Sequence, residues 1–189
     1  KNLITPETLD LLCQLARERD LPARIAALLA GKRVNQTEKR AARHTALRAG
    51  HAAPRDVRRT LNAMREFAGA LRGGSVKGVS GKPVTDVVSL GIGGSALGPA
   101  LAVDACAPGA TSPRVHFVTT PGEPLTQLLV TLDPAATLFI IQSKSFGTQE
   151  TALNARAAQA WLQAGFDASD YGNHFAAVTV NTEGARGFG

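Results

Sequence analysis

Hydrophobic residues recur at helical spacing through the first part of the chain. This pattern predicts three helices that begin near Pro6, Pro22 and Pro54, and proline is favoured in the first turn of a helix. The third helix carries one apolar stripe, formed by Val57, Leu61, Met64, Ala68 and Leu71. We therefore expect residues 1–73 to form an N-terminal helical segment and residues 74–189 to form a separate α/β domain.

The hydrophobic pattern changes after this helical segment. Four short apolar runs rich in β-branched residues predict strands at residues 84–90, 115–119, 138–142 and 175–180. Helical segments lie between them, at about residues 97–107, 124–132 and 148–164. Strands that alternate with helices predict an α/β fold, a doubly wound parallel sheet with helices on both faces. We expect a flavodoxin-like strand order, 2-1-3-4, in which strands one and three are neighbours.

Two predicted loops carry groups that bind phosphate. Residues 91–95 follow strand one, and their glycines let backbone N–H groups approach a ligand while Ser95 adds a hydroxyl. Residues 143–148 follow strand three and offer three hydroxyls and one ammonium group just before a helix. Ligands of open α/β sheets bind at the carboxyl ends of the strands where the strand order reverses, and helix N-termini favour anions. The two loops therefore predict one phosphate site at this edge of the sheet.

Other readings of the 91–95 loop are weaker. A dinucleotide site needs an acidic residue at the end of strand two, but the first acid there is Glu123. A nucleotide-binding P-loop needs Gly-Lys-Ser/Thr, which the chain lacks. Ser95 is no nucleophile of the Gly-x-Ser-x-Gly kind, since Leu97 replaces the last glycine. The four histidines have no metal-ligand spacing, and His116 and His174 are expected to be structural.

Composition limits the partners. The formal net charge is +6, which suits an anionic ligand, and aromatic residues make up only 5%, with no interleaving of aromatic and basic residues as in nucleic-acid binders. No apolar run approaches the roughly 20 residues of a membrane span, and the polar start has no signal-peptide pattern. Cys13 and Cys106 are expected to be buried, reduced thiols in helices, so we expect a cytoplasmic protein.

Four stretches of the sequence, in order, resemble the glucose-6-phosphate isomerase family. Residues 89–99 read SLGIGGSALGP and are similar to the family's GIGGS-x-LGP, with Ala96 where aspartate is frequent. Residues 138–151 read LFIIQSKSFGTQET and are similar to its SK-T/S-F-x-TxET signature. Residues 34–48 and 174–182 also agree. The resemblance runs in register over most of residues 34–189.

The resemblance implies a sugar-isomerase (SIS) domain whose two loops hold the phosphate of a sugar phosphate. It implies that Gly94 and Ser95 line one side of this site, and that the other side is formed by Ser143, Lys144, Ser145 and Thr148. The family's reaction is aldose–ketose isomerisation through an enediol, without metal or cofactor. Its catalytic glutamate, histidine, arginine and lysine belong to motifs beyond the matched region, so no catalytic residue is expected in this chain. In particular, Glu123, Glu150 and Glu183 do not fall in the motif of the base.

We therefore expect the N-terminal part of a longer enzyme that acts on glucose 6-phosphate and is a homodimer at full length, with no nucleic-acid or membrane partner. A sensor with the same fold, which would bind a sugar phosphate to regulate a partner, is the alternative. Such a sensor is expected to carry a DNA-binding or partner-binding module, whereas residues 34–48 resemble the isomerase's own upstream segment.

Overall fold

The computed structural model describes residues 3–106, 113–166 and 171–188. It contains two compact units, Lys1–Arg65 and Glu66–Gly189, and the boundary falls inside helix α3 (Arg55–Arg72). Both phosphate-binding loops predicted from the sequence belong to the second unit.

The first unit is only partly helical. Helices α1 (Pro6–Glu18) and α2 (Leu21–Leu29) form as predicted, and the Thr5 hydroxyl caps α1 by accepting a hydrogen bond from the Thr8 N–H at 3.2 Å. The stretch that follows α2 lies between the second and third predicted helices. That stretch holds turns, an isolated bridge between Asn35 and Arg40, and the 3-10 helices η1 (His44–Arg48) and η2 (Gly50–Ala52).

The second unit is built on a four-stranded parallel sheet. Its strands are β1 (Asp86–Leu90), β2 (Arg114–Val118), β3 (Thr137–Gln142) and β4 (Phe175–Val178), in the order β2-β1-β3-β4. All three pairings are parallel, and Leu90 at the end of β1 is in register with Val118 of β2 and Ile141 of β3. The doubly wound fold and the position of β1 between β2 and β3 are thus confirmed, and strand order reverses between β1 and β3.

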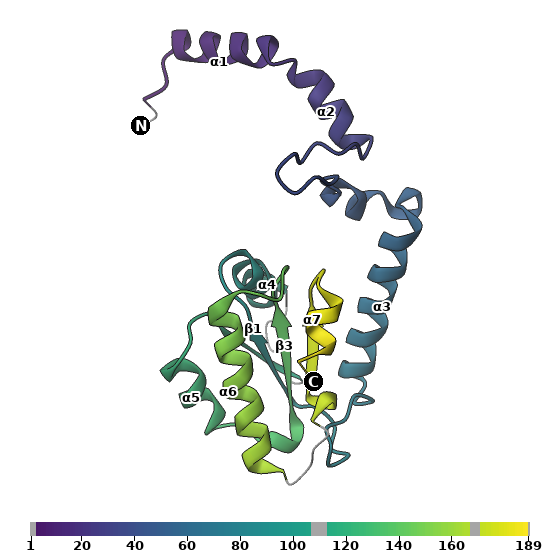
Figure 1. Cartoon of the computed structure of the whole chain (residues 1–189), viewed down its shortest axis with the longest axis vertical. Helices are drawn as coiled ribbons and strands as arrows, with labels where there is room; N and C mark the ends of the chain where they lie inside the picture. Colours follow the sequence, from purple (N-terminus) through teal and green to yellow (C-terminus); the bar gives the residue numbers. More distant parts are fainter. Residues whose placement is uncertain (1–2, 107–112, 167–170, 189) are drawn as a thin grey trace. The chain divides into compact units, whose positions relative to one another are not determined.

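Helices connect these strands (Figure 1). They are α4 (Gly94–Cys106), α5 (Glu123–Leu129) and α6 (Gln149–Gly165), with 3-10 helices η3 (Pro134–Ala136) and η4 (Gly172–His174) before β3 and β4. Helix α7 (Thr182–Arg186) follows β4. Helix α4 contacts β2, whereas α6 contacts β1 and β3. The crossover from β1 to β2 and the crossover from β3 to β4 run in opposite directions across the sheet. Because both are right-handed, they pass over opposite faces of the sheet. Helices α4 and α6 therefore begin at the same edge but cover different faces.

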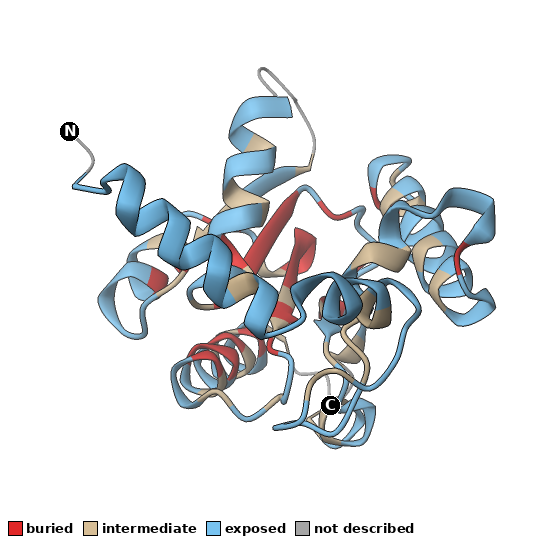
Figure 2. Cartoon of the chain, turned by 90° about the horizontal axis from the view of Figure 1, so that it is seen from above, coloured by how far each residue is buried: buried red, intermediate tan, exposed pale blue. Residues whose placement is uncertain are grey.

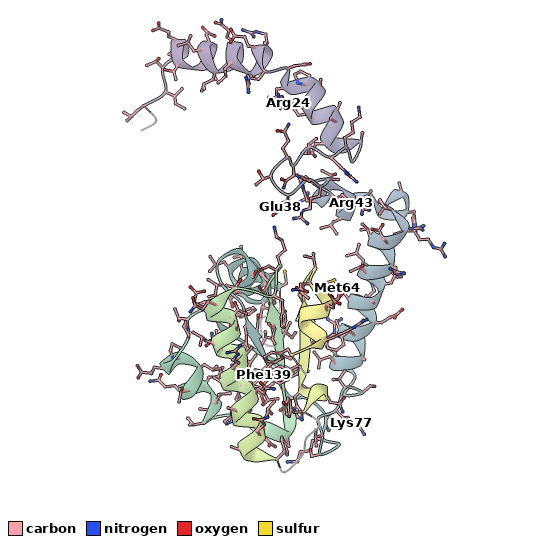
Figure 3. The ribbon with its side chains drawn as sticks, in the orientation of Figure 1. Arg24, Glu38, Arg43, Met64, Lys77 and Phe139 are labelled. Carbon is pink, nitrogen blue, oxygen red and sulfur yellow. The ribbon has the colours of Figure 1, made fainter. Side chains whose placement is uncertain are left out.

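The core lies on both faces of the strands, where buried residues concentrate (Figure 2). Alternate residues of β1 and β3, such as Val88 and Phe139, pack with α5 and α6. Phe139, labelled in Figure 3, is fully buried. Its ring meets the Trp161 ring edge-on, with the ring centroids 6.0 Å apart. The other face packs Val87 and Leu138 against Leu71 near the end of α3. The two central strands, β1 and β3, are therefore mostly apolar, because most of their side chains are buried on one face of the sheet or the other.

Two histidines in this unit have structural roles, as the sequence predicts. His174 is fully buried; its Nδ1 lies 2.8 Å from the Thr137 carbonyl and its Nε2 accepts a hydrogen bond from the Val79 N–H at 2.9 Å. His116 Nε2 lies 2.9 Å from a carboxylate oxygen of Asp86. Both histidines use their ring nitrogens within the protein rather than in the predicted site.

The prediction of buried cysteines was wrong. Cys13 and Cys106 are both exposed free thiols. Helix α1 buries none of its residues, and α4 buries only Ala96, so the side of each helix that carries the cysteine is exposed. None of the described helices is both long and apolar enough to cross a membrane.

Candidate functional site

The 91–95 loop lies directly against the end of β3. Gly91 has no room for a side chain, because a Cβ there would lie 3.2 Å from the Cβ atoms of both Gln142 and Ser95. Gly93 has a φ of 57°, a left-handed conformation that glycine adopts without strain. Gly94 begins α4, and the space beside its Cα is open. The glycines thus bring the start of α4 and Ser95 to the carboxyl edge of β3.

The 143–148 loop folds into a tight turn at the same edge. The Phe146 N–H donates to the Ser143 carbonyl at 3.1 Å, and the Gly147 N–H donates to the Ser145 hydroxyl at 3.2 Å. Phe146 has a φ of 55°, which is unfavourable for a residue with a side chain. Strained backbone of this kind often marks a functional loop.

Two of the predicted phosphate-binding hydroxyls meet in this loop. The hydroxyls of Ser143 and Thr148 lie 3.1 Å apart and share a hydrogen bond. Such a pair holds two protons: one is used between the hydroxyls, and the other is free for a ligand. Ser143 is buried, Thr148 is half-buried, and Lys144 and Ser145 are exposed.

The hydroxyl of Thr148 leaves the start of α6 without its usual cap. Thr148 is the N-cap residue, and a threonine there normally accepts a hydrogen bond from a first-turn N–H. Its side chain makes no such bond in the described structure and bonds Ser143 instead. The first amides of this 17-residue helix therefore have no side-chain acceptor at the N-cap, and the helix dipole adds positive potential there.

A cavity of about 210 Å³ lies behind the 143–148 loop, between α6 and α7. Its polar lining consists of hydroxyl and guanidinium groups, and no acidic residue contributes. The lining residues are Ile141, Ser143, Phe146, Thr148, Thr151, Ala152, Ala155, Arg156, Gly184, Gly187 and Phe188. Ser143 and Thr148 are thus brought together in one cavity, whereas Gly94, Ser95, Lys144 and Ser145 do not line it.

Two residues with polar side chains that line this cavity, Thr151 and Arg156, were not predicted from the sequence. The Thr151 hydroxyl is buried and has no hydrogen-bond partner among the described residues, although buried hydroxyls are normally paired. Arg156 lies five residues further along α6 and supplies the positive charge of the lining. The spacing of Thr148, Thr151 and Ala155 at i, i+3 and i+7 places them on one helix face. This spacing is the sequence signal that could have indicated which face of α6 lines the cavity.

No group of three or more metal-binding side chains is present in the parts of the chain that the structure describes. The site is therefore assembled from hydroxyls, backbone amides, helix starts and one nearby arginine. All of these donate hydrogen bonds or carry positive potential, and this is the requirement of a phosphate group.

The fold and this edge define a doubly wound α/β protein that carries a cluster of hydrogen-bond donors at its topological switch point. Comparison with known proteins gives the family. The phosphoglucose isomerase family model matches residues 1–189, and the chain belongs to that family.

The relatives agree with this assignment. The chain is 48% identical to the glucose-6-phosphate isomerase of Shewanella oneidensis and 45% identical to that of Cupriavidus taiwanensis, in each case over its whole length. It spans only 37% and 38% of those two proteins. A crystal structure of a glucose-6-phosphate isomerase from Chlamydia trachomatis matches 94% of the chain with a TM-score of 0.70 at 27% identity, over 36% of that structure.

Proposed function

We propose that this chain supplies the phosphate-binding part of a glucose-6-phosphate isomerase, which interconverts glucose 6-phosphate and fructose 6-phosphate in glycolysis and gluconeogenesis. Family membership supports the reaction, and the fraction of the relatives that the chain spans supports its being one part of a longer enzyme. A cytoplasmic homodimer belongs to the same proposal. The sensor alternative has no observation in its favour.

The observation that carries the proposal is the pair of loops at the β1–β3 switch point. The 143–148 loop presents the hydroxyls of Ser143, Ser145 and Thr148 at the uncapped start of α6. The 91–95 loop brings Gly94 and Ser95 to the same edge. Lys144 adds charge and backbone to the loop. A phosphate dianion accepts hydrogen bonds and donates none, so such a set of donors suits it.

The role of these residues is to bind and orient the substrate. Fixing the phosphate places the sugar carbons at a constant distance from the site, where groups elsewhere in the full-length enzyme act on them. The described acidic residues do not line the cavity. We therefore assign the proton transfer to residues outside this chain.

Replacing either hydroxyl that lines the cavity tests the proposal. A hydrogen bond to a charged group contributes about 1.5–3 kcal/mol, so Ser143→Ala and Thr148→Ala should each weaken glucose 6-phosphate binding by roughly 10- to 100-fold in the full-length enzyme. Ser145→Thr keeps a hydroxyl and is expected to change affinity little. Binding is measured by titration calorimetry, with the thermal midpoint recorded for each variant.

Two controls make the result specific. Thr126→Ala removes an exposed hydroxyl on α5 that bonds the Gly122 carbonyl, and we expect it to leave affinity unchanged. Unphosphorylated glucose should bind the Ser143 and Thr148 variants as it binds the parent. If both alanine variants retain the parent's affinity for glucose 6-phosphate, the 143–148 loop does not hold the phosphate.

A further inference from the structure

The segment that follows β4 is bonded to the 143–148 loop. We call residues 179–181 the anchor segment. The Thr179 hydroxyl and the Val180 N–H both donate to the Lys144 carbonyl, at 3.1 and 3.0 Å. The Asn181 side-chain amide donates to the Ser145 carbonyl at 3.0 Å. Two successive carbonyl groups of the loop are thus held by one short segment from the next strand.

Asn181 connects this loop to helix α7. While its Nδ2 donates to the Ser145 carbonyl, its Oδ1 accepts a hydrogen bond from the Gly184 N–H at 2.9 Å and caps α7. The geometry uses both ends of one side-chain amide. Aspartate has the same shape but no donor, and serine caps helices well but is too short to reach both partners. Asparagine is therefore the residue that matches this position.

The anchor also determines which way the loop's amides face. In a trans peptide the N–H and the C=O point in opposite directions. Because the Lys144 carbonyl is directed at the anchor segment by two donors, the Ser145 N–H points away from it. Phe146 has its left-handed conformation next to this peptide. Its ring packs edge-on against the ring of Phe188, with the ring centroids 6.0 Å apart. The loop's conformation thus depends on contacts from the anchor segment, which follows β4, and from Phe188, which follows α7.

We propose that Asn181 is a positioning residue for substrate phosphate. It fixes the 143–148 loop in the form that presents its hydroxyls and the Ser145 N–H to the ligand. This inference rests on the proposed function, and it extends the site to a residue that does not itself touch the phosphate. It assigns a role in affinity to a side chain that otherwise serves as the cap of α7.

Asn181→Ser in the full-length enzyme tests the proposal. Serine keeps the helix cap and removes the bond to the Ser145 carbonyl. We expect KM for glucose 6-phosphate to rise by roughly tenfold, with kcat changed less than about threefold and the thermal midpoint nearly unchanged. Asn181→Asp should raise KM above that of Asn181→Ser, because aspartate adds a negative charge. Only this additional increase in KM should diminish in high salt.

A double substitution separates positioning from general stability. If Asn181 acts through the loop, Asn181→Ser should raise KM by a smaller factor in a Thr148→Ala background than in the parent, because the hydroxyl that it helps to place is gone. An unchanged KM in Asn181→Ser, or full multiplicativity with Thr148→Ala, would overturn the inference. Should Asn181→Ser fail to fold, Thr179→Val removes a donor of the same anchor, and the hydroxyl that accepts the Asn181 N–H at 3.1 Å, while it keeps the Asn181 side chain that caps α7. It must show the same rise in KM.

The Ser143 and Thr148 variants distinguish this failure from that of the proposed function. If Ser143→Ala and Thr148→Ala raise KM while Asn181→Ser and Thr179→Val do not, only the role of the anchor is wrong. If none of the four raises KM, the loop is not the phosphate site.

Discussion

Asp86 is a buried carboxylate at the amino end of β1, at the opposite end of the strand from the 91–95 loop. Its oxygens accept hydrogen bonds from Arg114 at 2.8 Å and Thr85 at 2.9 Å, and lie 2.9 Å from His116 Nε2. Burial acts to raise the pKa of Asp86, but the hydrogen bonds from Arg114, His116 and Thr85 together outweigh it and lower that pKa. The ionised form is therefore the one that the fold stabilises.

Asp86→Asn tests this balance. Because hydrogen bonds between charged groups are lost while Arg114 stays largely solvated, we expect the free energy of unfolding at pH 7 to fall by about 1–3 kcal/mol. A lowered pKa stabilises the fold above the unfolded pKa, near 3.9, and this contribution disappears as the pH falls through the folded pKa. The difference between parent and variant should thus shrink below about pH 4.

Urea unfolding between pH 7 and pH 3 measures this difference. Asp104→Asn, at an exposed position on α4, is the matched control and should stay within about 0.5 kcal/mol of the parent. A parent-to-variant difference that is constant over this pH range would show that Asp86 is not stabilised as a carboxylate.

At the level of single residues, the sequence indicated which hydroxyls the candidate site contains but not which residues they contact. Ser143 and Thr148 could be found because hydroxyls between a strand and a helix are recognisable from local pattern. Asn181 could not be assigned in this way. The bond from Asn181 to Ser145 spans 36 residues, and only the pairing of β3 with β4 brings the two together.

Among the elements, the loop before β1 is held by a glycine with no space for a side chain. A Cβ at Gly78 would lie 2.4 Å from His174 Cε1 and 2.5 Å from the Ala135 carbonyl oxygen. Gly78→Ala must therefore displace either the buried ring or the η3 backbone. We expect a loss of roughly 1–3 kcal/mol in the free energy of unfolding.

Gly69→Ala is the opposite case and serves as control. Gly69 lies inside α3, where a Cβ meets nothing within 4 Å, and alanine favours helix over glycine by about 0.5–1 kcal/mol. The thermal midpoint should therefore rise for Gly69→Ala and fall for Gly78→Ala. Equal midpoints for the two variants would show that the loop adapts and that the packing of His174 is not critical.

Elements of the α/β unit were predictable because each strand is a short apolar run between loops. The predicted run 84–90 contains β1, and the predicted run 138–142 lies within β3. The stretch after α2 was not predictable in the same way, because its polar and small residues give no clear period. Helix α4 began three residues earlier than predicted, since Gly94 continues directly into helix.

At the scale of the whole molecule, helix α4 exposes large apolar side chains. Leu97 and Leu101 of α4 are 67% and 70% exposed, and this mostly apolar helix buries only Ala96. Such a helix is typical of a protein interior. This pattern supports the proposal that the chain is part of a longer enzyme, since the curated relatives are nearly three times as long.

The chain by itself should bind sugar phosphate but not isomerise it. A general base must lie within about 3 Å of the proton that it removes, and no acidic residue lines the cavity beside the predicted phosphate site. We expect no turnover of fructose 6-phosphate above buffer in an assay coupled to oxidation of glucose 6-phosphate.

The full-length Shewanella oneidensis protein is the positive control, because it is 48% identical over the matched region. Binding of fructose 6-phosphate to the same preparation, measured by calorimetry, shows that the phosphate site is folded. Turnover within about 100-fold of the control, a barrier difference of less than about 3 kcal/mol, would mean that a catalytic base lies in this chain after all.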